Sequence, residues 1–250
     1  MRAALNPGLP QASDELRRGS ARLQDLAYGY LKELLLAGGL DPGDQISSES
    51  VGRVLSISRA PVSDAIRRLT VEGLLEVVPQ VGCRVVRPVA AEVADFYEIF
   101  GATEGVVARF AAERRTSGEA GTFARLCARL ASRADLPRAP SARFVELRRR
   151  NRRRYETLHA LAGSPLSTAI GESFWDRSDF YIRVAFGQRE LPAYVRSGHR
   201  AFVAAVVAGD GPGAEHETRS YLVRLGHDVA ALLAGSGAER GAGLAGAGRG

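Results

Sequence analysis

Arginine and serine side chains recur along residues 58–72 at a spacing that could contact DNA. Arg59, Ser63 and Arg67 are four residues apart, so a helix would present all three on one face. The hydrophobic residues of the opposite face, three or four positions apart, are Val62, Ala65, Ile66 and Leu69. A guanidinium can bond a guanine edge or a phosphate through two N–H groups, and a helix with one basic and one apolar face fits a DNA major groove.

A shorter helix and a tight turn precede this segment. Hydrophobic positions predict the first helix, and Ile57 would fill the turn. Ser58 is a favourable N-cap for the second helix, and Pro61 lies in its first turn, where a missing N–H group is harmless. Residues 47–69 therefore predict a helix-turn-helix. Its candidate DNA contacts are Arg53, Ser58, Arg59, Ala60, Ser63 and Arg67.

Two short β-like runs follow, at residues 74–78 and 83–86. Gly82 lies in the connection between them, so the pattern predicts a β-hairpin. With a further helix expected to begin near residue 20, the hairpin would complete a winged helix-turn-helix domain over residues 20–88. Gly82 and Arg84 are candidate wing contacts, to phosphates more than to bases.

The remainder of the chain shows helical patterns punctuated by glycine and proline, and no further strand pattern. The predicted helices span 90–116, 119–134, 141–162, 165–187, 190–208 and 212–234. We expect a mainly α protein whose second domain, residues 89–234, is an all-α, antiparallel six-helix bundle. Residues 1–19 and 235–250 lack periodicity, and we expect a disordered arm and a disordered Gly/Ala tail.

The amino-acid composition constrains the function less strongly than these motifs do. Lys and Arg number 34 against 28 Asp and Glu, so the formal charge is +6 and the pI about 9.8, a lean toward polyanionic partners. Two cysteines, Cys83 and Cys127, give no disulfide or zinc framework. The sequence shows no apolar run that could span a bilayer and no apolar core of a signal peptide. We expect a cytoplasmic protein with no membrane partner.

Several phrases between Leu40 and Arg87 occur together in a characteristic order and spacing. They are Asp41-Pro42-Gly43, Ile57-Ser58-Arg59-Ala60-Pro61-Val62, Arg67-Arg68-Leu69 and Glu72-Gly73-Leu74. On these phrases the stretch resembles the GntR family of bacterial transcription regulators. The helical half resembles the FCD ligand-binding domain of the FadR subfamily, through Leu161-Ala162-Gly163-Ser164-Pro165, His199 with Gly209-Asp210, and Tyr221-Leu222.

The resemblance implies a homodimer that binds a near-palindromic operator in double-stranded DNA and responds to a small effector in the helical domain. Repression is the usual outcome in the family, and we expect it by analogy. The family usually has arginine where this chain has Glu49 and Ser63. A carboxylate at position 49 would repel a phosphate but could accept from a cytosine amino group, so we expect an unusual operator sequence.

FCD domains often hold a metal through an Asp, a His four residues later, and two histidines on later helices. The corresponding positions here are Asn151, Tyr155, His199 and Tyr221. One imidazole, one amide and two phenols are poor ligands for Zn²⁺ or a similar ion. We therefore expect no metal and no other cofactor.

Two interpretations of these inward positions stay open. The four residues could be buried polar groups that satisfy one another, or they could bind an organic effector. Phe100 occupies a position where the family often has arginine, and losing that cation argues for a larger, apolar or aromatic effector over a simple metal-chelating carboxylate. The candidate effector-binding residues are Phe100, Asn151, Tyr155, His199 and Tyr221. The arginines of 148–154 are expected to solvate the outer faces of their helix, with an auxiliary phosphate contact or an effector carboxylate clamp as the alternative.

The sequence thus predicts a ligand-responsive DNA-binding regulator. An alternative is a DNA-binding protein whose helical domain serves only for dimerisation. An enzyme is disfavoured because the inward positions offer no acid/base pair, with Asn151 where an acid would be needed.

Overall fold

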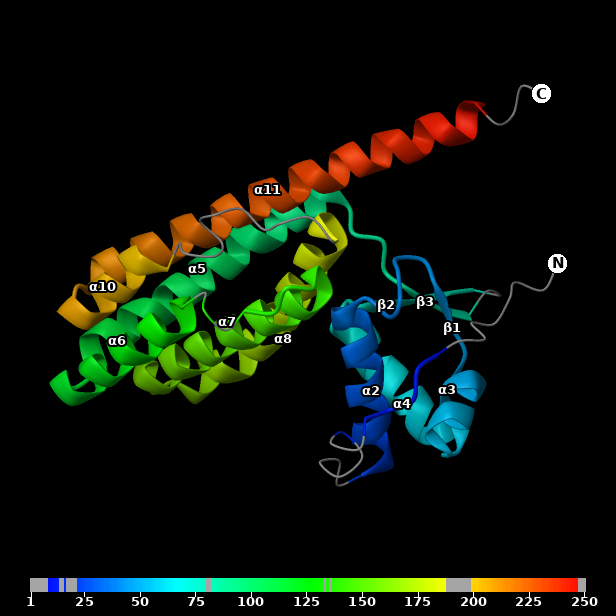
Figure 1. Cartoon of the computed structure of the whole chain (residues 1–250), viewed down its shortest axis with the longest axis horizontal. Helices are drawn as coiled ribbons and strands as arrows, with labels where there is room; N and C mark the ends of the chain where they lie inside the picture. Colours follow the sequence, from blue (N-terminus) through cyan, green and yellow to red (C-terminus); the bar gives the residue numbers. More distant parts are fainter. Residues whose placement is uncertain are drawn as a thin grey trace. The chain divides into compact units, whose positions relative to one another are not determined.

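A computed structural model describes residues 9–13, 16, 22–79, 82–132, 134, 136–187 and 199–246, with backbone only for residue 141 and for 236–246. The chain divides at residue 88 into two compact units, shown in Figure 1. Within the described residues, the helices are all too short or too polar to cross a membrane.

The first unit packs three helices against a small sheet. Its elements are α2 (Leu23–Ala37), β1 (Gln45–Ile46), α3 (Ser48–Leu55), α4 (Arg59–Val71), β2 (Leu75–Val78) and β3 (Gly82–Val85). Apolar side chains from all three helices, such as Leu31, Leu55 and Leu69, are buried in one core. The predicted winged helix-turn-helix is confirmed as a fold.

The wing has a third strand that the sequence did not predict. β1 pairs antiparallel with β3, which makes the strand order β1-β3-β2. Gln45 lies opposite Arg84, and Ile46 lies opposite Cys83. A two-residue strand is too short to show an alternating pattern, so only the tertiary pairing reveals it.

The turn between α3 and α4 is tight. Ser56 adopts a left-handed conformation with φ of 59°, and a Cβ at Gly52 would lie 2.8 Å from the carbonyl oxygen of Ile57. Gly52 therefore permits the close approach of helix and turn. Ser58 occupies the N-cap position of α4 with extended backbone, but its side chain makes no capping hydrogen bond, so the predicted cap is only positional.

Part of the expected N-terminal arm is packed against the first unit. Ala12 is buried, and the hydroxyl of Tyr30 donates to the carbonyl oxygen of Pro10 at 2.6 Å. The prediction of disorder is thus wrong for residues 9–13, because apolar contact and one side-chain hydrogen bond hold this segment. Most of the remaining arm lies outside the described residues.

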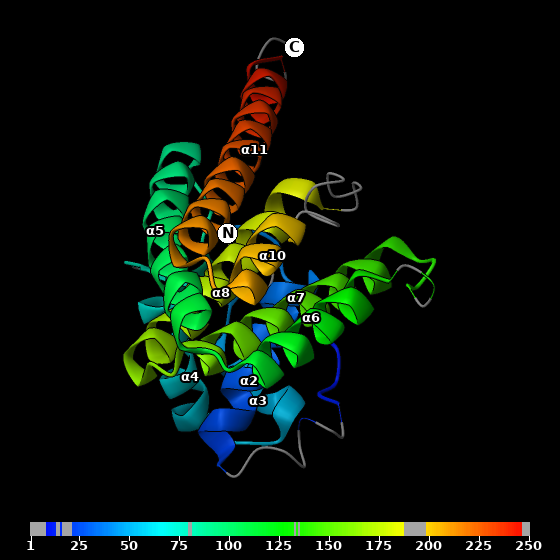
Figure 2. The same cartoon turned by 90° about the vertical axis from the view of Figure 1, so that its left-hand side faces the viewer.

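The second unit is helical throughout its described residues. Its elements are α5 (Ala90–Arg114), α6 (Ser117–Ala131), α7 (Pro140–Ala162), α8 (Pro165–Phe186), α10 (Arg200–Ala208) and α11 (Gly211–Gly246). α5 and α11 lie side by side and antiparallel, as both views in Figures 1 and 2 show. A Cβ at Gly105 would lie 3.0 Å from the carbonyl oxygen of Glu215, so this glycine allows the two helices to approach closely. The predicted mainly α class is confirmed.

Two boundaries differ from expectation. α11 continues past residue 234 to Gly246, where the composition predicted a disordered tail. Alanine is the strongest helix former and no proline interrupts the segment, so the backbone ladder can continue despite the glycines. The predicted helix over 190–208 is described only from His199 onward.

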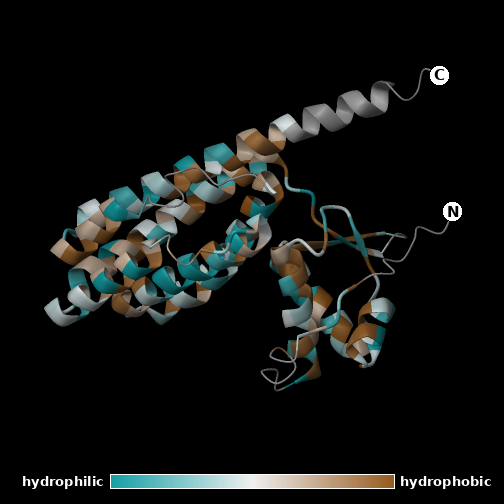
Figure 3. Ribbon diagram, in the orientation of Figure 1, coloured by the Kyte–Doolittle hydropathy of each residue, from teal (hydrophilic) through white to brown (hydrophobic). Residues whose placement is uncertain are grey.

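Figure 3 shows hydrophilic and hydrophobic residues alternating around the bundle helices, as expected for helices that bury one face.

Candidate functional site

The exposed face of α4 carries the predicted DNA contacts. Ser63 and Arg67 are exposed on the side opposite the buried Val62 and Leu69. Arg59, at the start of the helix, is also exposed. Such a face is open to a macromolecular partner and rests on a packed core, which keeps the helix rigid.

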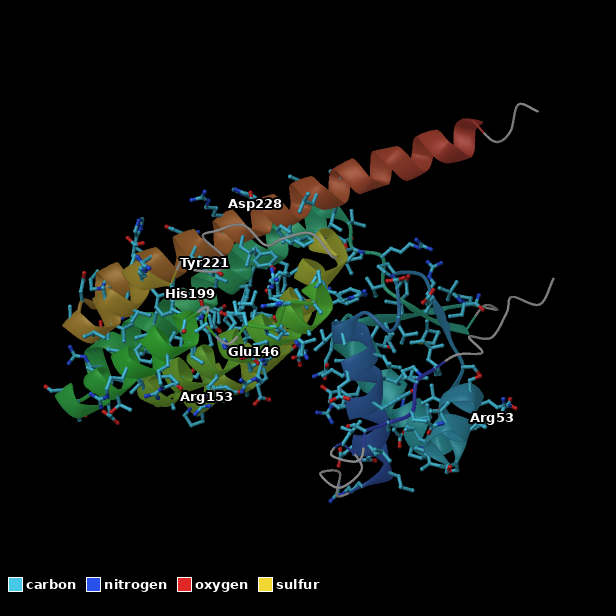
Figure 4. All side chains as sticks on the ribbon, viewed as in Figure 1. Arg53, Glu146, Arg153, His199, Tyr221 and Asp228 are labelled. Atoms are coloured by element: carbon cyan, nitrogen blue, oxygen red, sulfur yellow. The ribbon has the colours of Figure 1, made fainter. Side chains whose placement is uncertain are left out.

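A carboxylate on α3 neutralises part of this face. Glu49 Oε2 lies 2.6 Å from Arg59 Nη2, and Glu49 Oε1 lies 3.4 Å from Arg53 Nη2. Figure 4 shows Arg53 extending from α3. The Glu49 and Arg59 side chains are 55% and 68% exposed, so the ion pair is solvated. Arg59 can therefore leave Glu49 for another anion at a small cost in free energy.

The other predicted arginines are also paired. Arg67 forms an ion pair with Asp64 on the same helix, and Arg84 Nε lies 2.7 Å from Glu76 Oε1 across the wing. The remaining predicted contacts, Ser58, Ala60, Ser63 and Gly82, are exposed. The structure therefore brings the predicted contact residues of α3 and α4 to one surface and leaves each predicted arginine with a local carboxylate.

Arg68, the neighbour of Arg67 on α4, packs against another helix of the same domain. Its guanidinium lies 3.6 Å from the ring centroid of Tyr28 on α2, and its Nε lies 3.6 Å from Glu72 Oε1. Arg68 thus fixes α4 against α2 through a cation–π contact and an ion pair.

A second candidate site is a small cavity in the helical unit, with a volume of about 50 Å³. Three predicted residues, Asn151, His199 and Tyr221, line it. The rings of His199 and Tyr221 are 4.6 Å apart between centroids, and Figure 4 shows them close together on neighbouring elements. Roughly three water molecules would fill this volume.

The other two predicted residues contribute less directly. The Tyr155 ring packs 3.8 Å from Trp175 and 5.8 Å from His199, so it supports the wall of the cavity. Phe100 is fully buried in an aromatic cluster, 4.8 Å from Trp175, and does not line the cavity. The prediction that Phe100 faces an effector therefore lacks support from the geometry.

The interpretation that these polar groups satisfy one another does not hold for two of them. Among the described residues, the Tyr155 hydroxyl and His199 Nδ1 are buried without a hydrogen-bond partner. Burial, with a smaller contribution from Arg154, lowers the pKa of His199 well below its ordinary value, so its imidazole is neutral near pH 7. Burial raises the pKa of Tyr155 and of Tyr221, so both phenols keep their protons.

This donor set does not suit the metal that the family often holds. Two protonated phenols and an amide are weak ligands, which leaves His199 as the single good donor. In the part of the chain that the structure describes, His, Cys, Asp and Glu form no group of three that could hold a metal ion.

The arginine run holds residues that the sequence analysis misplaced. Arg150 and Arg154 are buried, at 8% and 5% exposure, although solvation of outer helix faces was expected. Arg150 pairs with Glu146 and donates to the carbonyl oxygen of Ser132. Arg154 lines the cavity and donates to Asn151 Oδ1 at 3.1 Å. Helical spacing could have shown this, because Leu147, Asn151, Arg154 and Leu158 share one face.

A buried cluster beside the cavity was also missed. His159 Nε2 lies 3.0 Å from both carboxylate oxygens of Glu104, and Trp175 Nε1 donates to Glu104 Oε1 at 3.2 Å. Glu104 is completely buried. Its position four residues after Phe100, on the same apolar face of α5, was the available signal.

The fold and the two sites define a class: regulators with a winged helix-turn-helix and a helical ligand-binding domain. The model of the gntR family of bacterial regulatory proteins matches residues 23–85, and the FCD domain model matches residues 95–224. The chain belongs to the GntR family and carries an FCD domain. It is a GntR-type DNA-binding transcriptional regulator, a kind of protein that is typically not an enzyme.

Similar proteins agree with this assignment. The chain is 30% identical over 89 residues to an uncharacterized HTH-type transcriptional regulator in the TAR-I ttuE-ttuC' intergenic region of Agrobacterium vitis, covering 36% of this chain and 52% of the relative. It is 35% identical over 68 residues to one in an unstable DNA locus of Streptomyces ambofaciens, covering 27% and 29%. The chain thus spans about half or less of these curated relatives.

Solved structures share the fold. E. coli McbR/YncC aligns with a TM-score of 0.64 and 21% identity, covering 82% of this chain and 95% of that one. A putative GntR regulator from Rhodococcus sp. RHA1 gives 0.64 and 18%, covering 86% and 99%.

Proposed function

We propose that this regulator binds a near-palindromic operator as a homodimer and represses transcription until a small organic effector enters the FCD domain. The observation that carries the DNA-binding part is the exposed α4 face, with Arg59, Ser63 and Arg67 on a rigid, packed helix. A dimer would place two such helices in successive major grooves. Because the operator lies on the chromosome, the protein would act in the cytoplasm.

The proposed DNA contacts are divided by role. Arg59 and Arg67 would read bases or phosphates from α4, with Arg53 and Ser58 at the edge of the same surface. Gly82 and Arg84 would bring the wing to the backbone. Each arginine would exchange its surface carboxylate for the DNA, so binding should weaken as salt rises.

The effector-responsive part rests on the cavity. Polar groups from three segments converge there, and two nearby buried polar atoms lack partners in the described structure. Convergent polar groups in an apolar pocket are typical of a ligand site. We further propose that the domain works without a metal or other cofactor, because its donor set is too weak. Although Phe100 stands where the family often has a cation, Arg154 supplies a cation at the cavity.

The test of DNA binding is Arg59→Ala, measured by fluorescence anisotropy on a duplex that the wild-type protein selects from a random pool. The variant should lose about 1–3 kcal/mol of specific binding if Arg59 reads a base. Arg68→Ala is the matched control, since Arg68 lies on the same helix but packs on Tyr28. Equal affinity of Arg59→Ala and wild type would remove α4 as the reading helix.

A further inference from the structure

Two hollows of the helical unit meet at the same two side chains. The inner cavity of about 50 Å³ and an outer groove of about 610 Å³ are both lined by Arg154 and His199. The groove is walled by residues of α6 and α10. Its small apolar lining residues are Ala124, Ala128, Ala131, Val203, Ala204 and Val207. The groove is therefore mostly apolar, although Ser132 and Arg200 also line it, and it shares the buried Arg154 and His199 with the inner cavity.

The cation shared by the two hollows is buried without a counter-ion in the described part of the chain. Arg154 is 5% exposed and donates to the amide oxygen of Asn151, and its Nε has no hydrogen-bond partner among the residues that the structure describes. Among the described residues it forms no ion pair. Asp179 lines the same cavity, but the acid lies 3.5 Å from Arg152. Burying an unpaired charge costs several kcal/mol, so folding alone gives no reason for this arginine.

Arg150 shows what a structural arginine looks like in the same place. It lies one helical turn earlier on α7 and is similarly buried. Its guanidinium is occupied by the Glu146 carboxylate and by the carbonyl oxygen of Ser132. The contrast indicates that Arg154 keeps its donors for a group outside the chain.

We propose that Arg154 anchors the carboxylate of an amphipathic effector whose apolar body lies in the α6–α10 groove. The inference rests on the proposed sensor role of the FCD domain and names the class of its ligand: monocarboxylates with an aliphatic or aromatic body. A planar guanidinium matches the two oxygens of a carboxylate. The neutral His199 and the Tyr155 hydroxyl lie close by with unused hydrogen-bonding atoms. Arg154 thus takes the part that a metal plays in related domains, and the groove selects the body.

The test uses the full chain and pairs of ligands that differ only in charge. Hexanoate, octanoate and phenylacetate are compared with hexanamide, octanamide and phenylacetamide by thermal denaturation and calorimetric titration. The acids should raise the denaturation midpoint by several degrees, and the amides should not. Hexyl phosphate tests whether Arg154 accepts a bulkier anion. Because the inner cavity is small, we expect hexyl phosphate to bind more weakly than hexanoate.

Two variants separate a ligand anchor from a structural residue. Arg154→Gln should weaken carboxylate binding at least tenfold, while the midpoint of the ligand-free variant stays equal to wild type or rises, since an unpaired buried charge is removed. Arg150→Gln should lower the ligand-free midpoint, because it leaves Glu146 and a carbonyl group unpaired. Arg154→Gln should also keep wild-type affinity for selected DNA, so that a failure of the ligand arm is not confused with a failure of DNA binding.

Three results would overturn the inference: amides that bind as well as acids, an Arg154→Gln protein that keeps carboxylate affinity, or no midpoint shift with any of the three acids. The first would leave a sensor that does not select for charge, and the second a carboxylate held by a group other than Arg154. A marked loss of ligand-free stability in Arg154→Gln would instead make Arg154 a structural residue and equally reject the anchor.

Discussion

The arginines proposed to bind ligands in the two units lie in opposite settings. On the DNA-binding unit, Arg59 and Arg67 are well exposed and Arg84 is half-buried, and each has a carboxylate beside it. In the helical unit, Arg154 is buried, and no carboxylate within the described residues pairs with it.

The contrast shows how the burial of an arginine determines what its pairing means. An exposed ion pair is worth about 0–1 kcal/mol, so its arginine can leave the carboxylate for a phosphate at little cost. A buried guanidinium cannot be left bare at so small a cost. Pairing on an open surface is therefore compatible with binding, whereas the absence of pairing in a core points to a missing anion.

The largest effect is expected where a buried carboxyl group already has internal hydrogen-bond partners. Glu104→Leu would leave His159 and Trp175 Nε1 buried without their acceptor. Removing one member of a buried pair typically costs about 3–5 kcal/mol, and we expect a loss of that size in the free energy of unfolding. Urea denaturation followed by circular dichroism measures it.

Glu98→Leu is the matched control on the same helix. Glu98 pairs with Arg219 at 3.3 Å, and its side chain is 50% exposed. We expect a change within about 1 kcal/mol. If the two variants unfolded alike, burial would not distinguish the ion pairs of this protein, and the contrast drawn for Arg154 would lose its basis.

A smaller effect is expected at Asp179, which depends on pH. Burial raises the pKa of Asp179 from 3.8 to about 7, against the lowering influence of Arg152 and Arg148; Asp176 adds to the rise. The native state then keeps a proton that the unfolded state releases, so this group makes stability fall as pH rises from about 4 to about 7.

Asp179→Asn should remove that dependence. At about 1.4 kcal/mol for each pKa unit, the variant should exceed wild type at pH 8 by at most about 4 kcal/mol, and should match it near pH 4. Urea midpoints at both pH values measure the difference. A variant less stable than wild type at pH 8 would show that the carboxylate is charged and held by Arg152.

Local patterns in the sequence predict most of the fold. The stripe from Val62 to Leu69 and the hairpin of the wing are short-range signals, and both are realised, although Gly82 begins strand β3 and does not lie in the connection. The strand β1 and the packed segment 9–13 depend on contacts with distant residues, such as Gln45 with Arg84 and Pro10 with Tyr30. No local pattern encodes those contacts.

The site in the helical unit was harder to predict, because charged residue types suggested exposure where the side chains are buried. A run of arginines suggests a solvated surface, yet helical spacing places Arg154 on the inward face with Asn151. Glu104 likewise looked like an ordinary helical acid. In both cases the periodicity of the helix was the better guide, whereas the pairing of each charge could only come from the tertiary structure.

The smallest effect is expected at Glu49. The direction of the change in DNA affinity shows which role Glu49 has. If Glu49 merely holds Arg59, Glu49→Gln frees the guanidinium and should tighten DNA binding by up to about 1 kcal/mol, most strongly at low salt. If Glu49 instead accepts from a cytosine amino group, the same change should weaken binding and relax the preference at that base pair. Anisotropy titrations on the selected duplex, across salt concentrations, measure both. Glu172→Gln, an equal charge change on an exposed residue of α8, corrects for net charge. Tighter binding by both variants would mean that only overall charge matters, and the Glu49–Arg59 pair would then have no role of its own in recognition.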